Sequence, residues 1–117
     1  MLSKKEERFL NIARTLAAKS QLHHKHGAIV VKSGRVLGRG FNKPRNHPRM
    51  IETGRHAAEC GYHAEIVAIK DAGNNVSGAI IFVARINNDG EDLLSKPCSR
   101  CQKVLNSRKI KNVIFTK

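Results

Sequence analysis

The sequence is poor in aromatic residues and has no long apolar run. Only 4% of its 117 residues are aromatic and none is tryptophan, so its core must consist mainly of Ile, Val, Leu and Ala. No stretch of about 18 apolar residues is present, which excludes a membrane-spanning helix. The amino-terminal segment is charged and lacks the apolar run of a secretory signal. We therefore expect a cytoplasmic protein without a membrane partner.

Acidic residues and cysteines are also scarce. There are 9 Asp and Glu against 22 Lys and Arg, which gives a net charge of +13 and favours anionic partners such as phosphates or nucleic acid. Three cysteines, two of them spaced as C-x-x-C, indicate metal or redox chemistry rather than a disulfide framework. The length fits one domain that spans residues 1–117.

Apolar periodicity predicts three helices and four strands. Ser3 and Glu6 have the spacing of a capping box at the start of a helix over residues 3–19. Two apolar runs around the turn residues 32–35 predict a hairpin. The strands are expected at 27–31, 36–41, 79–84 and 112–116, and the other two helices at 63–72 and 98–107.

The order of these elements predicts an α/β sheet with helices on its faces. The run over 79–84 is continuously apolar, which is typical of a strand buried on both faces. Gly38 and Gly40 are unusual inside a strand and indicate a bulge, or the close approach of a ligand or another backbone.

Three residues of types that commonly bind metals lie at predicted helix starts: His63, Cys98 and Cys101. The positive end of a helix dipole favours thiolate over thiol. One imidazole and two thiolates are ordinary zinc ligands, and three protein ligands leave a fourth position for water. Zinc lowers the pKa of such a water from about 15.7 to about 7. Glu65, two residues after His63, is placed to take the proton of that water.

Two segments, His63-Ala64-Glu65 and Pro97-Cys98-Ser99-Arg100-Cys101, together resemble the H-x-E and P-C-x-x-C signature of the zinc-dependent nucleobase deaminases. This superfamily includes cytidine, deoxycytidylate and tRNA adenosine deaminases, and the tail IKNVIFT is similar to phage and bacterial deoxycytidylate deaminase-like sequences. The resemblance implies a cytidine deaminase-like three-layer α/β/α fold, with a mixed sheet and helices on both faces. It also implies one zinc ion per chain.

The resemblance further implies roles for individual residues. Glu65 would be the catalytic acid and base of a hydrolytic deamination, and His63, Cys98 and Cys101 would be the zinc ligands. Asn42 would contact the sugar or base of the substrate. The backbone near Ala64 and Pro97 would line the site, and the chain is expected to form a homo-oligomer, as relatives commonly do.

A basic loop leaves the substrate class open. Arg45 and its neighbours either recognise a 5′-phosphate or a polynucleotide backbone, or form a solvated surface. We expect a cytosine nucleotide such as dCMP, and the alternative is cytosine or adenine within single-stranded DNA or RNA. Four Phe and one Tyr offer few stacking platforms for a strand. The loop contains Lys43, Arg45, His47, Arg49 and Arg55.

Other interpretations remain at this point. Cys60 or His56 would close the metal site as a fourth, structural ligand, and the chain would then be a zinc-stabilised nucleic-acid-binding domain. A redox role for the C-x-x-C motif leaves Glu65 unexplained. Tyr62 would stack on a base or simply pack. We expect the three histidines before the first strand to be a solvated basic segment, with metal or phosphate binding as the alternative; they are His23, His24 and His26.

Overall fold

The computed structural model describes residues 2–22, 24–43 and 63–117. The predicted helices and strands are confirmed, each to within two residues at either end. The structure adds one short strand, β4, between the predicted strand at 79–84 and the predicted helix at 98–107. The elements are α1 (Lys4–Ala17), β1 (Lys25–Lys32), β2 (Arg35–Phe41), α3 (Ala64–Ala72), β3 (Ile80–Ile86), β4 (Asp92–Leu93), α4 (Ser99–Ser107) and β5 (Asn112–Phe115).

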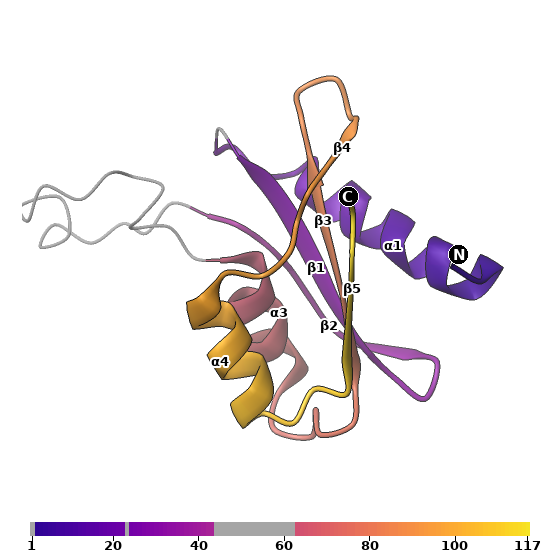
Figure 1. Cartoon of the computed structure of the whole chain (residues 1–117), viewed down its shortest axis with the longest axis vertical. Coiled ribbons are helices and arrows are strands. Elements are labelled where there is room, and N and C mark those ends of the chain that lie inside the picture. Colours follow the sequence, from indigo (N-terminus) through magenta and orange to yellow (C-terminus); the bar gives the residue numbers. More distant parts are fainter. Residues whose placement is uncertain (1, 23, 44–62) are drawn as a thin grey trace, which may run out of the picture.

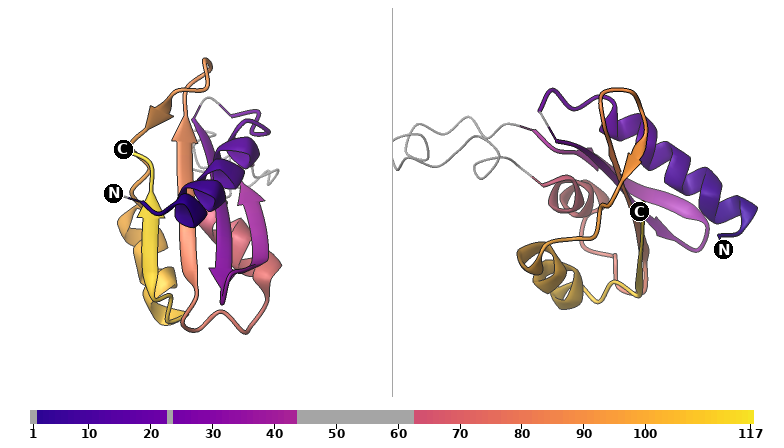
Figure 2. Two further views of the ribbon diagram at one scale, coloured as in Figure 1. Left: turned by 90° about the vertical axis from the view of Figure 1, so that its right-hand side faces the viewer. Right: turned by 45° about the horizontal axis from the view of Figure 1, so that its top comes forward.

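The sheet is mixed and lies between helices. Strand β1 pairs with β2 and β3, and β3 pairs with β4, all in antiparallel orientation, whereas β5 runs parallel to β3. Helix α1 crosses one face, and α3 and α4 cover the other (Figures 1 and 2). The expected three-layer α/β/α arrangement is therefore confirmed.

The central strand β3 separates two apolar clusters. Ile81 and Val83 pack on the α3 side together with Val30 and Leu105, whereas Phe82 packs on the α1 side. Residues 81–84 are all buried, as the continuous apolar run predicted. Because side chains alternate along a strand, this assignment also fixes which face each neighbouring residue of β1 and β3 occupies.

Helix α1 carries both local and long-range contacts. Its capping box is formed, with Ser3 Oγ accepting from the Glu6 backbone N–H at 3.1 Å and Glu6 Oε1 accepting from the Ser3 backbone N–H at 3.0 Å. Arg14 donates from Nε and Nη2 to the two carboxylate oxygens of Asp92, each at 2.8 Å. This bidentate pair holds β4 against α1, and residues so far apart in the chain give no local sequence signal.

The glycines of β2 accommodate helix α3. A Cβ atom on Gly38 would lie 2.3 Å from the carbonyl oxygen of Ala68. A Cβ atom on Gly40 would lie 2.6 Å from the backbone nitrogen of Ala68. The β1–β2 register also shifts between Val30 and Val31, which marks a bulge. Both expectations for these glycines, a bulge and the close approach of another backbone, are confirmed.

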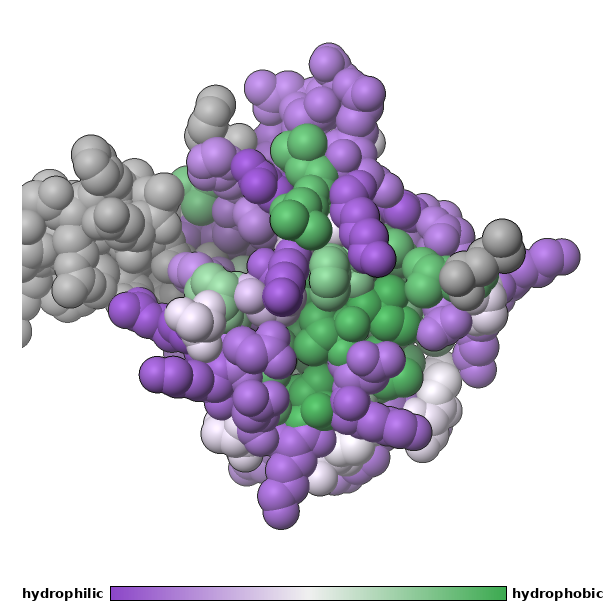
Figure 3. All heavy atoms as spheres, viewed as in Figure 1, coloured by the Kyte–Doolittle hydropathy of each residue, from purple (hydrophilic) through white to green (hydrophobic). Residues whose placement is uncertain are grey.

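On the face that Figure 3 shows, the surface of the described residues is largely hydrophilic, and an apolar area lies along β5. Leu94, in the segment after β4, is 58% exposed. Within the three ranges given above, no helix has the length and apolar character needed to cross a bilayer.

We predict that Gly38→Ala lowers the free energy of unfolding by at least about 2 kcal/mol, because its methyl group forces α3 away from β2. The neighbouring Arg39 is exposed, so Arg39→Ala should cost no more than about 0.5 kcal/mol. Urea denaturation of both variants measures the difference. Equal stabilities would mean that the close packing of α3 does not constrain the fold.

Candidate metal centre

His63 and Cys98 occupy equivalent positions in two helices. Each is the N-cap residue of its helix, α3 or α4, with extended backbone dihedrals and no side-chain capping hydrogen bond. N-cap positions usually carry Ser, Thr, Asp or Asn, whose side chains bind the free N–H groups. Imidazole and thiol groups here are instead available to a ligand outside the helix. Cys101 lies one turn further along α4, on the same side as Cys98.

The three side chains converge on one point. His63 Nδ1 lies 3.2 Å from Cys101 Sγ and 3.8 Å from Cys98 Sγ. All three ligand atoms lie within 4.8 Å of one another. Tetrahedral zinc with Zn–S near 2.3 Å and Zn–N near 2.0 Å places nitrogen and sulfur about 3.6 Å apart. The observed spacing fits zinc, and no other such group occurs in the part of the chain that the structure describes.

The Cys101 thiol is buried and lies near negative groups. Burial raises its pKa most, and the Glu65 carboxylate and Cys98 raise it further. A thiol in this environment keeps its proton unless a cation replaces it. Zinc binding must therefore release protons, and the affinity for zinc should fall as the pH falls.

Glu65 is the buried carboxylate of the centre. It is the second residue of α3, only 4% exposed, and its charge contributes to the raised pKa of the Cys101 thiol. Neither ion pair found among the described residues involves it. A carboxylate held beside three metal ligands, with no ion pair in the described part of the chain, is placed to exchange protons with a metal-bound ligand.

The other predicted substrate contacts have different surroundings. Ala64 and Pro97 are buried and adjoin His63 and Cys98 in the chain, so both lie at the centre. The Asn42 side chain binds the start of β1: Oδ1 accepts from the His26 N–H at 2.9 Å, and Nδ2 donates to the His24 carbonyl. Substrate contact by Asn42 remains a prediction. Several candidates lie outside the described residues: His23, Arg45, His47, Arg49, Arg55, His56, Cys60 and Tyr62.

His26 differs from the expectation for the histidine segment. Its side chain is half-buried, and its pKa is lowered to about 4, first by burial and then by the charges of Arg85, His24 and His63. The expectation of a solvated segment is therefore wrong for the half-buried His26. Arg85 was not singled out by sequence reasoning. The available signal was a lone charged residue near the end of an apolar strand.

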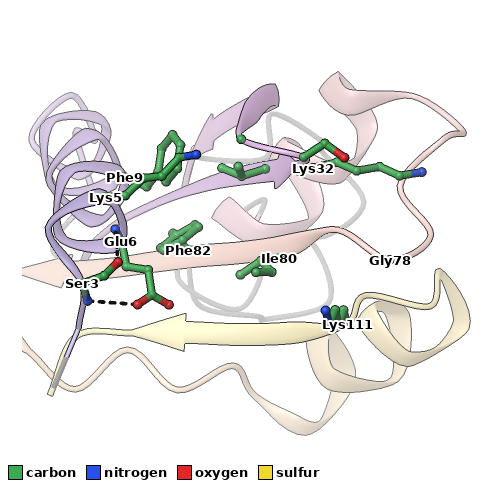
Figure 4. A pocket seen from close by; sticks show the side chains of 12 residues that line it. Ser3, Lys5, Glu6, Phe9, Lys32, Gly78, Ile80, Phe82 and Lys111 are labelled. Atoms are coloured by element: carbon green, nitrogen blue, oxygen red, sulfur yellow. Dashed lines mark hydrogen bonds between the residues drawn. The ribbon is translucent and has the colours of Figure 1, made fainter.

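A separate cavity lies on the opposite face of the sheet. It has a volume of about 440 Å³ and an apolar floor that includes Ile80 and Phe82, with three lysines around it (Figure 4). None of the metal-ligating residues lines it. The cavity lies on the face of the sheet that α1 alone covers. Because the metal-ligating residues lie elsewhere, we place the chemistry at the starts of α3 and α4.

We predict about one zinc ion per chain in protein purified without chelators. Cys101→Ala should abolish stoichiometric zinc, because it removes one of the three ligand atoms that converge at the site. Ser99 is exposed between the two cysteines, so Ser99→Ala should retain the metal. Elemental analysis by mass spectrometry decides this. Zinc retained in full by Cys101→Ala would exclude the proposed ligand set.

His26 should make stability depend on pH. Its pKa is about 4 in the folded chain and about 6.5 when unfolded. Between these values only the unfolded chain binds the proton, so this contribution to stability is lost as the pH falls from about 6.5 towards 4. We predict that His26→Gln loses less unfolding free energy than the wild type between pH 7.5 and pH 5. Parallel losses in the two proteins would contradict this.

Comparison with known proteins agrees with this geometry. Residues 3–117 match the family described as "Cytidine and deoxycytidylate deaminase zinc-binding region". The dCMP deaminase of cyanophage S-TIM5 superposes with a TM-score of 0.72 at 22% identity, covering 98% of this chain and 84% of that chain. That enzyme has also been solved in complex with dCMP and dUMP.

Two further matches come from studies of tRNA editing and from riboflavin biosynthesis. A structure from studies of A-to-I editing by tRNA:A34 deaminases has a TM-score of 0.60 at 21% identity, covering 95% of this chain and 75% of that chain. "Riboflavin biosynthesis protein PYRD, chloroplastic" from Zea mays is 26% identical over 113 residues. The match covers 92% of this chain but only 23% of the maize protein. Structural likeness at these identities establishes the fold, and the family match extends over almost the whole sequence. This chain belongs to the cytidine and deoxycytidylate deaminase zinc-binding family.

Proposed function

We propose that this chain is a zinc-dependent hydrolytic deaminase that converts cytosine to uracil in a nucleotide such as dCMP, with release of ammonia. The observation that carries the proposal is the buried carboxylate of Glu65 beside the cluster of His63, Cys98 and Cys101. A structural zinc site needs no such carboxylate. A hydrolytic site needs a group that moves protons between water and the substrate.

The chain's residues divide the chemistry as follows. When bound, zinc supplies a water whose pKa is lowered to near neutrality. Glu65 accepts a proton from the attacking water while the oxygen of that water bonds to C4 of the ring. Glu65 then delivers this proton to the adjacent ring nitrogen. It then passes the second proton to the departing amine, so that cytosine and water become uracil and ammonia. Burial of Glu65 excludes competing bulk water from these transfers.

The choice of a cytosine nucleotide has two supports. The matched family is that of cytidine and deoxycytidylate deaminases, and the cyanophage relative is a dCMP deaminase. The net charge of +13 also favours a phosphorylated substrate over a neutral nucleoside. Within this proposal, Asn42 contacts the sugar or base, Ala64 and Pro97 line the pocket, and Arg45 contributes to phosphate binding.

A second candidate is deamination of a base within single-stranded DNA or RNA. The observation that favours it is the same charge of +13, which is large for a chain of 117 residues and suits a polyanion. Against it stands the small number of aromatic side chains, since single-strand binders usually stack bases on aromatic rings. The two candidates share the chemistry of Glu65 and differ only in the substrate.

We predict that Glu65→Gln lowers the turnover rate by about 10³-fold or more while zinc content and the folded structure remain. The amide has nearly the same shape but cannot carry the proton. Glu91→Gln serves as the matched control, because Glu91 is an exposed acid in the loop before β4. Substantial product from Glu65→Gln would refute the proton-transfer role.

The product assay should use mass spectrometry with zinc-loaded protein and a panel of substrates. Suitable members are deoxycytidine, dCMP, dCTP, and single-stranded DNA and RNA oligonucleotides that contain C or A. Conversion of dCMP to dUMP without conversion of oligonucleotides supports the first candidate. Conversion of oligonucleotides alone supports the second, and no conversion of any member contradicts both.

A further inference from the structure

Arg85 lies at the same end of the sheet as the metal centre. It is directly opposite His26 in the antiparallel pairing of β3 with β1. Ile81 and Val83 of β3 pack on the α3 side. Because side chains alternate, Arg85 projects from that face too, towards the layer that holds His63 and Cys98.

Among the described residues, no ion pair compensates the charge of Arg85. Its Nη2 contacts the His24 ring nitrogen Nδ1 at 2.9 Å. Its Nε atom is buried and has no hydrogen-bond partner in the described part of the chain. A buried donor without a partner costs about 1–3 kcal/mol, so the structure retains an unfavourable cation at this position.

The neighbouring groups connect Arg85 to the site. Ala64, which follows His63 in the chain, packs in the same buried cluster as Val83, two residues before Arg85. The guanidinium therefore lies on the side of the sheet that the start of α3 covers. Asn42 binds the backbone of both His24 and His26 and so fixes the segment that packs against Arg85.

We propose that Arg85 binds the phosphate of the substrate, with His24 orienting the guanidinium. This inference rests on the proposed function, since it assumes that the reacting base lies at the metal centre. The planar guanidinium offers paired N–H donors that match the oxygens of a phosphate. A nucleotide whose base reaches the zinc ligands would place its 5′-phosphate against the one uncompensated cation identified on this face of the described sheet.

The test is a binding measurement in a protein that does not turn over. Zinc-loaded Glu65→Gln is titrated by calorimetry with dCMP, with deoxycytidine and with an oligonucleotide that contains one C. Adding Arg85→Gln should weaken dCMP binding at least about tenfold, the equivalent of about 1.4 kcal/mol. Deoxycytidine affinity should change less than about twofold. Arg85→Lys should fall between, because it keeps the charge but loses the paired donors.

Arg108→Gln is the matched control. Arg108 is another half-buried arginine, whose Nη2 donates to the Gly73 carbonyl at 2.7 Å at the far end of α3. It should leave the ratio of dCMP to deoxycytidine affinity unchanged. Should Arg85→Gln fail to fold by circular dichroism, Arg85→Lys decides the question through the same ratio.

The outcomes separate the two proposals. Equal weakening of dCMP and deoxycytidine, or unchanged dCMP binding, overturns the role of Arg85 while leaving the deaminase proposal intact. A loss confined to the oligonucleotide also overturns it, because the guanidinium would then bind a strand phosphodiester. If Glu65→Gln with intact Arg85 binds none of the three ligands, both the proposed function and this inference are rejected.

Discussion

The close contact between helix α3 and strand β2 is the constraint on which the site depends. Two glycines of β2 let the backbone of α3 approach within a distance that any side chain would prevent. The start of α3 carries His63 and Glu65, so the depth of this packing determines where the imidazole and carboxylate lie. Helix α4 reaches the same point because Cys101 and Leu105 are buried beneath it.

The two faces of the sheet have different tasks. The α1 face is an apolar layer, held at one end by the Arg14–Asp92 pair, and contains none of the metal ligands. The α3 face combines an apolar core with polar side chains at the ends of β1 and β3. At the same end, burial and neighbouring positive charge, of which Arg85 is the largest source, lower the pKa of His26 to about 4.

Much of the fold could be predicted from the sequence because its signals are local. The capping box at Ser3, the apolar alternation of the strands and the glycines at 38 and 40 each act through nearby residues. Strand β4 could not be predicted, since its two residues are too few for an alternating pattern and it forms by pairing with the end of β3. The metal ligands were predictable because helix starts and residue types coincide. The lowered pKa of His26 and the unpaired Nε of Arg85 could not be predicted, because both follow from cross-strand pairing and burial.

The central claim is that one zinc ion is held by three protein ligands and one exchangeable water. X-ray absorption spectroscopy at the zinc edge of the purified protein tests this most directly, because sulfur and nitrogen or oxygen neighbours give distinct distances. We expect two sulfur atoms near 2.3 Å from the zinc and two nitrogen or oxygen atoms near 2.0 Å from it, with scattering from a single imidazole. A third sulfur or a second imidazole would show a closed, structural site and would contradict it.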